Sequence, residues 1–244
     1  MNDNTPILLL FSSGTSGKSA KPILYTADDK KNMEICISRF YEIHKQNGTY
    51  YNLLPFAPHL GYYLGAMYGE ITGSLTINTG GGKHVTSEKT VGIMRSFPPE
   101  MIAGLPGYIL KVLNLSKKNN IDLSQVKLII GANGINDKFI KECKLLCPNA
   151  VIYATYGFTE ARVAWTTCND SSCGYHVFPE SGRFEIDPVN SELIFYSNHY
   201  LDGFHTGDEG IILEGETCSN CGKKCQRLGF EIKRLDGMVK NYDI

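Results

Sequence analysis

The chain has 244 residues, of which 42% are hydrophobic and 20% are charged, and its formal net charge is -1. This composition is typical of a globular protein with one large domain or two subdomains, and the near-neutral charge argues against a broad nucleic-acid-binding surface. No apolar run reaches transmembrane length, and the N-terminus MNDNTPILLLF lacks signal-peptide features. We therefore expect a cytoplasmic protein that binds neither membranes nor nucleic acid.

The predicted elements alternate between strands and helices over the first two thirds of the chain. The run PILLLF, residues 6–11, predicts a strand. An amphipathic helix is predicted over 27–48, with Thr26 as N-cap, Asp29 near its third position and Gly48 as its stop. The further predicted strands are 50–56, 74–78, 125–132 and 150–157, and the further predicted helices are 87–97, 106–119 and 136–147. This alternation predicts an α/β fold with a largely parallel sheet and helices on its faces.

The pattern changes after about Tyr175. Residues 182–197 predict two strands around a turn, and residues 210–235 predict a further β-rich piece. We place a boundary near Thr155, which gives an α/β nucleotide-binding subdomain, 1–155, and a smaller β-rich subdomain, 156–244. No internal repeat is visible.

The stretch FSSGTSGKSAK, residues 11–21, follows the first predicted strand. Gly17-Lys18-Ser19 ends like a Walker A loop, but Ser12 stands where that motif needs a glycine. Closely spaced backbone N–H groups, several hydroxyls and two lysines could still hold a phosphate. The alternative is an ordinary Ser/Gly surface turn.

Two carboxylates stand at positions suited to a nucleotide site. Glu160 follows the predicted strand 150–157, where a parallel sheet gathers its ligands, and it could hold Mg²⁺ against phosphate oxygens. Asp208, in HTGD, could accept both hydroxyls of a ribose. A solvated loop carboxylate and an ordinary turn are the respective alternatives.

Taken in order, SSGTSGKSAK, YGFTEA, HTGD and KRLDGMVK resemble four motifs of the adenylate-forming superfamily, which includes acyl-coenzyme A synthetases and peptide-synthetase adenylation domains. Within it, NTGGGKHVTSEKT, GLPGYIL and a Cys…His…Cys set are similar to phenylacetate–coenzyme A ligases. Two positions depart from the pattern: Lys233 replaces the usual glycine before Arg234, and His205 replaces a common arginine.

The resemblance implies that a carboxylate attacks ATP to form acyl-AMP, with Thr15 and Glu160 beside Mg²⁺ and Lys18 on phosphate. These three residues would be catalytic. The implied ATP-binding residues are Ser12, Ser13, Gly14, Thr15, Ser16, Gly17, Lys18, Gly131, Ala132, Asn133, Tyr156, Gly157, Thr159, Glu160, Asp208 and Arg234. His59, Gly61 and Tyr62 would lie at the acyl substrate.

Six clustered residues offer metal ligands: Cys168, Cys173, His176, Cys218, Cys221 and Cys225. In a reducing compartment such clusters indicate a metal before disulfides, and Cys218-x-x-Cys221 has the spacing of a zinc knuckle. The resemblance favours structural Zn²⁺ on Cys168, His176, Cys218 and Cys221, with Cys173 and Cys225 as substitutes. The alternative is a set of unrelated buried thiols.

The implied function is ATP-dependent activation of a carboxylic acid, followed by transfer to the thiol of coenzyme A or of a carrier protein. Family members usually carry a further N-terminal region and a C-terminal domain of roughly a hundred residues. We expect that domain to be absent here, and a partner protein could supply it. The alternatives are a nucleotide-binding module without independent turnover and an acyl-protein synthetase that uses Cys225.

Overall fold

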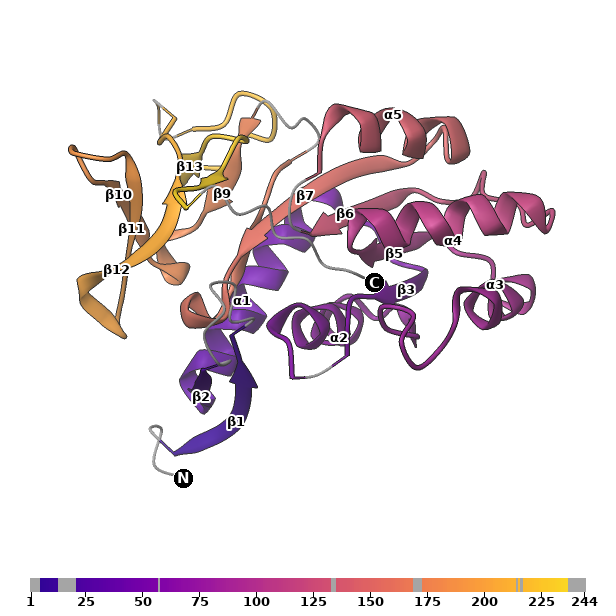
Figure 1. The fold of residues 1–244 in the computed structure, drawn as a ribbon, viewed down its shortest axis with the longest axis horizontal. Coiled ribbons are helices and arrows are strands. Elements are labelled where there is room, and N and C mark those ends of the chain that lie inside the picture. Colours follow the sequence, from indigo (N-terminus) through magenta and orange to yellow (C-terminus); the bar gives the residue numbers. More distant parts are fainter. Residues whose placement is uncertain are drawn as a thin grey trace.

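The computed structural model describes residues 5–12, 21–56, 58–132, 135–168, 173–213, 215 and 217–236 (Figure 1). The helices are α1 (Ala27–His44), α2 (Leu60–Thr72), α3 (Ser87–Ser96), α4 (Pro106–Lys118) and α5 (Asp137–Leu146), with short 3₁₀ turns η1 (Thr159–Ala161) and η3 (Pro179–Ser181). The strands are β1 (Pro6–Phe11), β2 (Pro22–Thr26), β3 (Thr49–Leu53), β4 (Leu75–Asn78), β5 (Met101–Gly104), β6 (Leu128–Ala132), β7 (Val151–Gly157), β8 (Ala164–Thr166), β9 (Tyr175–Val177), β10 (Arg183–Ile186), β11 (Glu192–Ser197), β12 (Tyr200–Glu209), β13 (Gln226–Leu228) and β14 (Lys233–Arg234).

An eight-stranded sheet forms the centre of the fold, in the order β13-β9-β8-β7-β6-β5-β3-β4. The strands from β4 to β7 are mutually parallel, whereas β8, β9 and β13 continue the sheet in antiparallel pairing. The predicted α/β class with a largely parallel sheet is therefore confirmed. A four-stranded sheet, β10-β11-β12-β14, and the hairpin β1-β2 complete the structure.

The helices cover both faces of the large sheet. The chain runs outward from β3 to β4 and then returns to the opposite side of β3 as β5, β6 and β7. Because right-handed crossovers in opposite directions lie on opposite faces, α2 belongs to one face and α4 and α5 to the other. Figure 1 shows this division, with α1 beside α2 below the sheet.

Helix α1 begins as predicted and ends earlier than predicted. The Thr26 hydroxyl accepts from the Asp29 N–H, and the Asp29 carboxylate accepts from the Thr26 N–H, which forms the capping box. At the other end, Lys45 adopts the left-handed conformation (φ 52°) and its N–H donates to the Tyr41 carbonyl. The helix therefore stops at His44, and the predicted stop at Gly48 is wrong.

Short elements account for the other differences. The strands β2 and β5, of five and four residues, were not predicted. The hairpin β10-β11 matches the predicted pair of strands. Within 210–235, β13 and β14 have only three and two residues, so the described part of this segment is poorer in strands than predicted. The boundary near Thr155 stays a prediction, and strands after it extend the large sheet.

Candidate active site

The predicted phosphate loop connects the strands of the β1-β2 hairpin. Residues Ser13, Gly14, Thr15, Ser16, Gly17 and Lys18 lie outside the described residues. At the base of the loop, the Ser12 N–H donates to the Lys21 carbonyl, and the Lys21 N–H donates to the Ser12 hydroxyl at 3.2 Å. Antiparallel pairing of β1 with β2 therefore fixes where the loop leaves and rejoins the structure.

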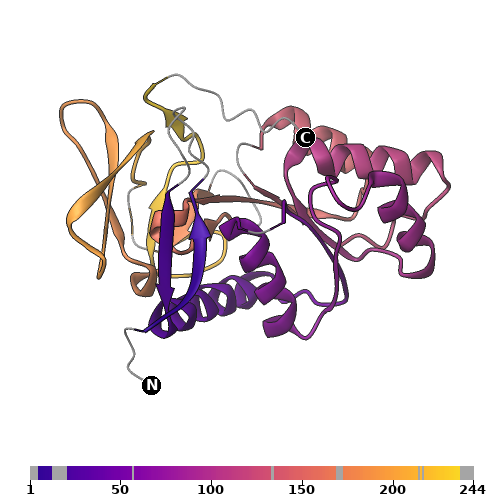
Figure 2. The same ribbon diagram turned by 60° about the horizontal axis from the view of Figure 1, so that its bottom comes forward.

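Both strands of this hairpin contact the segment that follows β7. The Tyr25 hydroxyl donates to the Thr159 carbonyl at 2.7 Å, and the Thr159 hydroxyl donates to the Phe11 carbonyl at 3.5 Å. These bonds join residues 134 and 148 positions apart in the chain. The fold thus brings two of the predicted motifs together, and Figure 2 shows the hairpin strands in front.

Glu160 lies one residue further along this segment, in η1, and is half-buried. Its carboxylate has no hydrogen bond or ion pair with any of the residues that the structure describes. The backbone carbonyl of Glu160 accepts from Arg162, which has a left-handed backbone (φ 65°). Carboxylate oxygens are ligands that Mg²⁺ prefers, so this side chain is free to bind a metal as far as the described residues are concerned.

Arg162 is a site residue that the sequence did not single out. Its Nε lies 3.3 Å from Oδ2 of Asp29, a buried carboxylate, and its guanidinium stands 5.5 Å from the centroid of the Tyr25 ring. The same side chain donates to the Leu24 carbonyl. Arg162 therefore ties η1 to α1 and β2, and its place directly after the YGFTEA motif was the available signal.

The predicted ribose motif forms a buried polar cluster. Asp208 is 5% exposed; its Oδ2 accepts from the Tyr156 hydroxyl at 2.8 Å, and its Oδ1 pairs with Arg234 at 3.1 Å. Burial, and then the Asp208 carboxylate, raise the pKa of Tyr156 well above its ordinary value, so its hydroxyl stays a donor. Tyr156, Asp208 and Arg234, all predicted to bind nucleotide, are therefore in contact in the structure. The carboxylate keeps further lone pairs for ribose hydroxyls.

Strands β6 and β7 bring the remaining predicted nucleotide residues to one edge. Gly131 pairs with Ala154 and Ala132 with Thr155, while Gly157 ends β7. A Cβ on Gly131 would lie 2.3 Å from the Ile135 side chain, so only glycine fits there. Asn133 lies outside the described residues. The carboxyl ends of these strands face the side on which open α/β sheets bind ligands.

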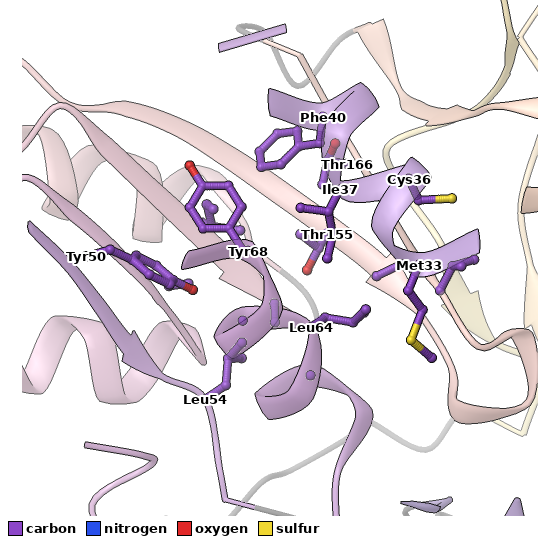
Figure 3. A pocket seen from close by; sticks show the side chains of 17 residues that line it. Met33, Cys36, Ile37, Phe40, Tyr50, Leu54, Leu64, Tyr68, Thr155 and Thr166 are labelled. Carbon is purple, nitrogen blue, oxygen red and sulfur yellow. The ribbon is translucent and has the colours of Figure 1, made fainter. Parts of the chain in front are cut away.

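An apolar cavity of about 100 Å³ lies between α1, α2 and the sheet (Figure 3). Gly61, predicted at the acyl substrate, lines it together with Ala132 and Thr155 from the strand ends. Tyr62 packs on Phe56 instead, and His59 is exposed at the start of α2 without a side-chain cap bond. The structure thus brings Gly61, but not His59 or Tyr62, to this cavity.

The clustered cysteines and histidine meet beside strand β9. The ligand atoms of Cys168, Cys173, His176 and Cys218 all lie within 4.8 Å of one another. The Sγ atoms of Cys168 and Cys218 are 3.8 Å apart, and the Cys221 Sγ is 3.3 Å from Nε2 of His176. Tetrahedral zinc needs about 3.8 Å between two sulfurs and about 3.5 Å between sulfur and nitrogen, so both pairs fit.

Two further contacts bear on the ligand set. His176 Nδ1 lies 3.3 Å from the Thr166 carbonyl; donation there leaves Nε2 to face the cysteines, as in metal-bound histidines. The Cys168–Cys173 sulfur distance of 2.7 Å is shorter than a tetrahedral edge. Cys221 and Cys225 lie outside the group of four. The Cys225 thiol is buried, and its pKa is raised to about 12 by burial and then by neighbouring thiols. A buried protonated thiol is a poor nucleophile.

The protein has an α/β fold, and the residues predicted to bind nucleotide lie near the carboxyl ends of its parallel strands, where such sheets bind ligands. The chain belongs to the family of AMP-binding enzymes, whose model matches residues 1–184. A phenylacetate-coenzyme A ligase from Aromatoleum evansii is 31% identical over 127 residues, which are 50% of this chain and 28% of that protein. No helix among the described residues is both long and apolar enough to span a membrane.

Solved structures share the fold. A 2-hydroxyisobutyryl-CoA ligase with 2-HIB-AMP and CoA superimposes with a TM-score of 0.76 at 14% identity, covering 98% of this chain and 55% of that chain. A long-chain-fatty-acid-CoA ligase from Archaeoglobus fulgidus gives 0.64 at 16% identity, covering 95% and 52%. The chain therefore spans about half the length of these proteins.

Proposed function

We propose that this protein activates a carboxylic acid with ATP to form acyl-AMP and pyrophosphate, and that the acyl group then passes to a thiol of coenzyme A or a carrier protein. The observation that supports this most is the pair of hydrogen bonds that join Thr159 to Tyr25 and Phe11, on the two strands that flank the predicted phosphate loop. Thr159 directly precedes Glu160, whose carboxylate has no partner among the described residues. The family assignment and the similarity to acid–CoA ligases support the same reaction.

In this proposal the chain acts by positioning and by neutralising charge rather than through a protein nucleophile. Glu160 holds Mg²⁺, which neutralises phosphate charge when it is bound. Asp208 and Arg234 hold the ribose, and Thr15 and Lys18 of the loop meet the phosphates. The acyl group lies in the apolar cavity, whose rim, at Ala132 and Thr155, is formed by the same strand ends.

Pyrophosphate exchange with ATP–Mg²⁺ and a panel of carboxylic acids tests the reaction directly. Acid-dependent exchange that Glu160→Gln abolishes, with the fold intact by circular dichroism, is the expected result. Because the chain spans about half of its solved relatives, nucleotide binding is measured separately by titration with a non-hydrolysable acyl-AMP mimic. If the mimic does not bind at high micromolar concentration, the nucleotide assignment fails.

We further propose that the cysteine cluster holds one structural Zn²⁺. Cys168, His176 and Cys218 supply three ligands, and Cys173 and Cys221 compete for the fourth position. The sulfur–sulfur and sulfur–nitrogen distances support this, as does the chemistry of the donors. Metal analysis after purification without added zinc, on the matched variants Cys173→Ser and Cys221→Ser, identifies the fourth ligand as the one whose loss lowers the zinc content.

A further inference from the structure

Tyr50 is a buried residue with a polar group in the lining of the apolar cavity. Tyr50, on β3, is 1% exposed and lines the cavity, where Figure 3 shows it beside Tyr68. None of the residues that the structure describes hydrogen-bonds to this hydroxyl. Its ring packs against Tyr68, with centroids 5.0 Å apart.

Neighbouring buried tyrosines, unlike Tyr50, have hydrogen bonds to their hydroxyl groups. The Tyr51 hydroxyl donates to the Phe97 carbonyl at 2.7 Å, and the Tyr68 hydroxyl lies within 3.3 Å of both the His44 ring and the Gln46 carbonyl. Leaving a buried hydroxyl unbonded is unfavourable, so such groups are normally satisfied by protein, water or ligand. Burial raises the pKa of Tyr50, which therefore keeps its proton and can both donate and accept.

The register of the sheet places Tyr50 at the deep end of the cavity. Leu54, Ala132 and Thr155 lie near the carboxyl ends of their strands, where the proposed ATP site is. Ala103 and Ile130, which also line the cavity, pair with each other one level deeper. Tyr50 precedes Leu54 by four residues and therefore lies deeper than the rim residues. A molecule that entered at the rim would meet the Tyr50 hydroxyl with its far end.

We propose that the Tyr50 hydroxyl binds a polar group at the far end of the acyl chain, so that the cavity selects a short carboxylic acid with a terminal hydroxyl or carbonyl. This inference rests on the proposed acid-activating function. Among the described residues the cavity lining contains no lysine, arginine, aspartate or glutamate, so the terminal group is uncharged.

The volume limits the size of the acid. An engineered protein cavity of about 150 Å³ holds benzene, whereas this cavity has about 100 Å³. About four non-hydrogen atoms beyond the carboxylate fit at that density. The matched probes are therefore 4-hydroxybutanoate and butanoate, which differ only in the terminal hydroxyl.

The experiment measures the dissociation constants of both acids by ligand-observed NMR and their pyrophosphate exchange rates. We expect wild-type protein to bind 4-hydroxybutanoate about tenfold more tightly than butanoate. Tyr50→Phe should remove this preference and change the dissociation constant of butanoate less than about twofold. Tyr51→Phe is the matched control: it removes a bonded tyrosine hydroxyl from the next position and should keep the preference. Ala103→Val, which fills the cavity, should weaken both acids.

The two readouts separate the inference from the function. Binding that depends on the Tyr50 hydroxyl, without any exchange, would support the inference and count against acid activation. Two results would overturn the inference: that neither probe binds, or that Tyr50→Phe lowers the affinities for both probes equally. If other acids still support pyrophosphate exchange, the proposed function stands in either case.

Discussion

His44 should make the fold sensitive to mild acid. It is 8% exposed, at the end of α1, and its Nδ1 accepts from the Gln46 N–H at 2.9 Å. Its Nε2 lies 3.2 Å from the hydroxyl of Tyr68, a cavity residue. A ring that accepts at Nδ1 must be neutral, with its proton on Nε2. Burial accordingly lowers the pKa of His44 from 6.5 to about 4.

The lowered pKa of His44 in the folded state determines how stability changes with pH. In the unfolded chain His44 binds a proton near pH 6.5, whereas in the folded chain it does so only near pH 4. The unfolded state therefore binds more protons in this window, and stability is lost as the pH falls from about 7 to about 4. Between pH 7.5 and 5.0 the expected loss from this one group is about 2 kcal/mol.

Urea unfolding of wild type and His44→Gln at both pH values isolates this contribution. The variant lacks the titrating ring and keeps every other ionisable group, so the difference between the two pH-dependent losses belongs to His44. We expect wild type to lose about 2 kcal/mol more than the variant. Equal losses in the two proteins would refute the reasoning.

Three further predictions concern the candidate sites. Tyr156→Phe removes the hydrogen bond to buried Asp208 and should lower the free energy of unfolding by about 2 kcal/mol; an unchanged urea midpoint would contradict the described contact. Glu160→Gln should abolish magnesium-dependent exchange yet leave the melting temperature within a degree or two, because the carboxylate has no partner among the described residues, and persistent exchange would reassign the metal ligand. Purified protein should contain about one zinc per chain, and chelation should lower its melting temperature; a metal-free chain of equal stability would leave the cluster as buried thiols.

Local signals predicted much of the fold. The capping box of Thr26 and Asp29 lies within four residues, so the start of α1 was readable from the sequence. The end of α1 depends instead on Lys45 in a left-handed conformation. The sequence predicted the end at Gly48, because glycine adopts that conformation more readily than lysine. The continuous apolar runs of β6 and β7 indicated buried parallel strands, because this signal also lies within the segment itself.

Long-range geometry explains what the sequence could not predict. Tyr50 and Tyr51 are both fully buried aromatic residues of β3, and only the pairing of the strand decides which one faces the cavity. The ion pair of Arg162 with Asp29 joins α1 to η1 across the fold. The spacing of Cys218 and Cys221 favoured Cys221 as a zinc ligand, whereas the fold also brings Cys173 within 2.7 Å of Cys168, a contact that spacing does not reveal.

The hydrogen bonds from Tyr25 and to Phe11 have a consequence for how the protein folds. The hairpin strands are among the first residues to be synthesised, but their partner, Thr159, follows 134 and 148 positions later. Contacts of such sequence separation form late, because a long loop must close before they are gained. The pairing of β1 with β2 is local, but docking of this hairpin requires that β7 and Thr159 have been synthesised. The proposed nucleotide site therefore assembles only after β7 has formed, and nucleotide binding by a nascent or refolding chain is expected to report that the hairpin has docked on the segment after β7.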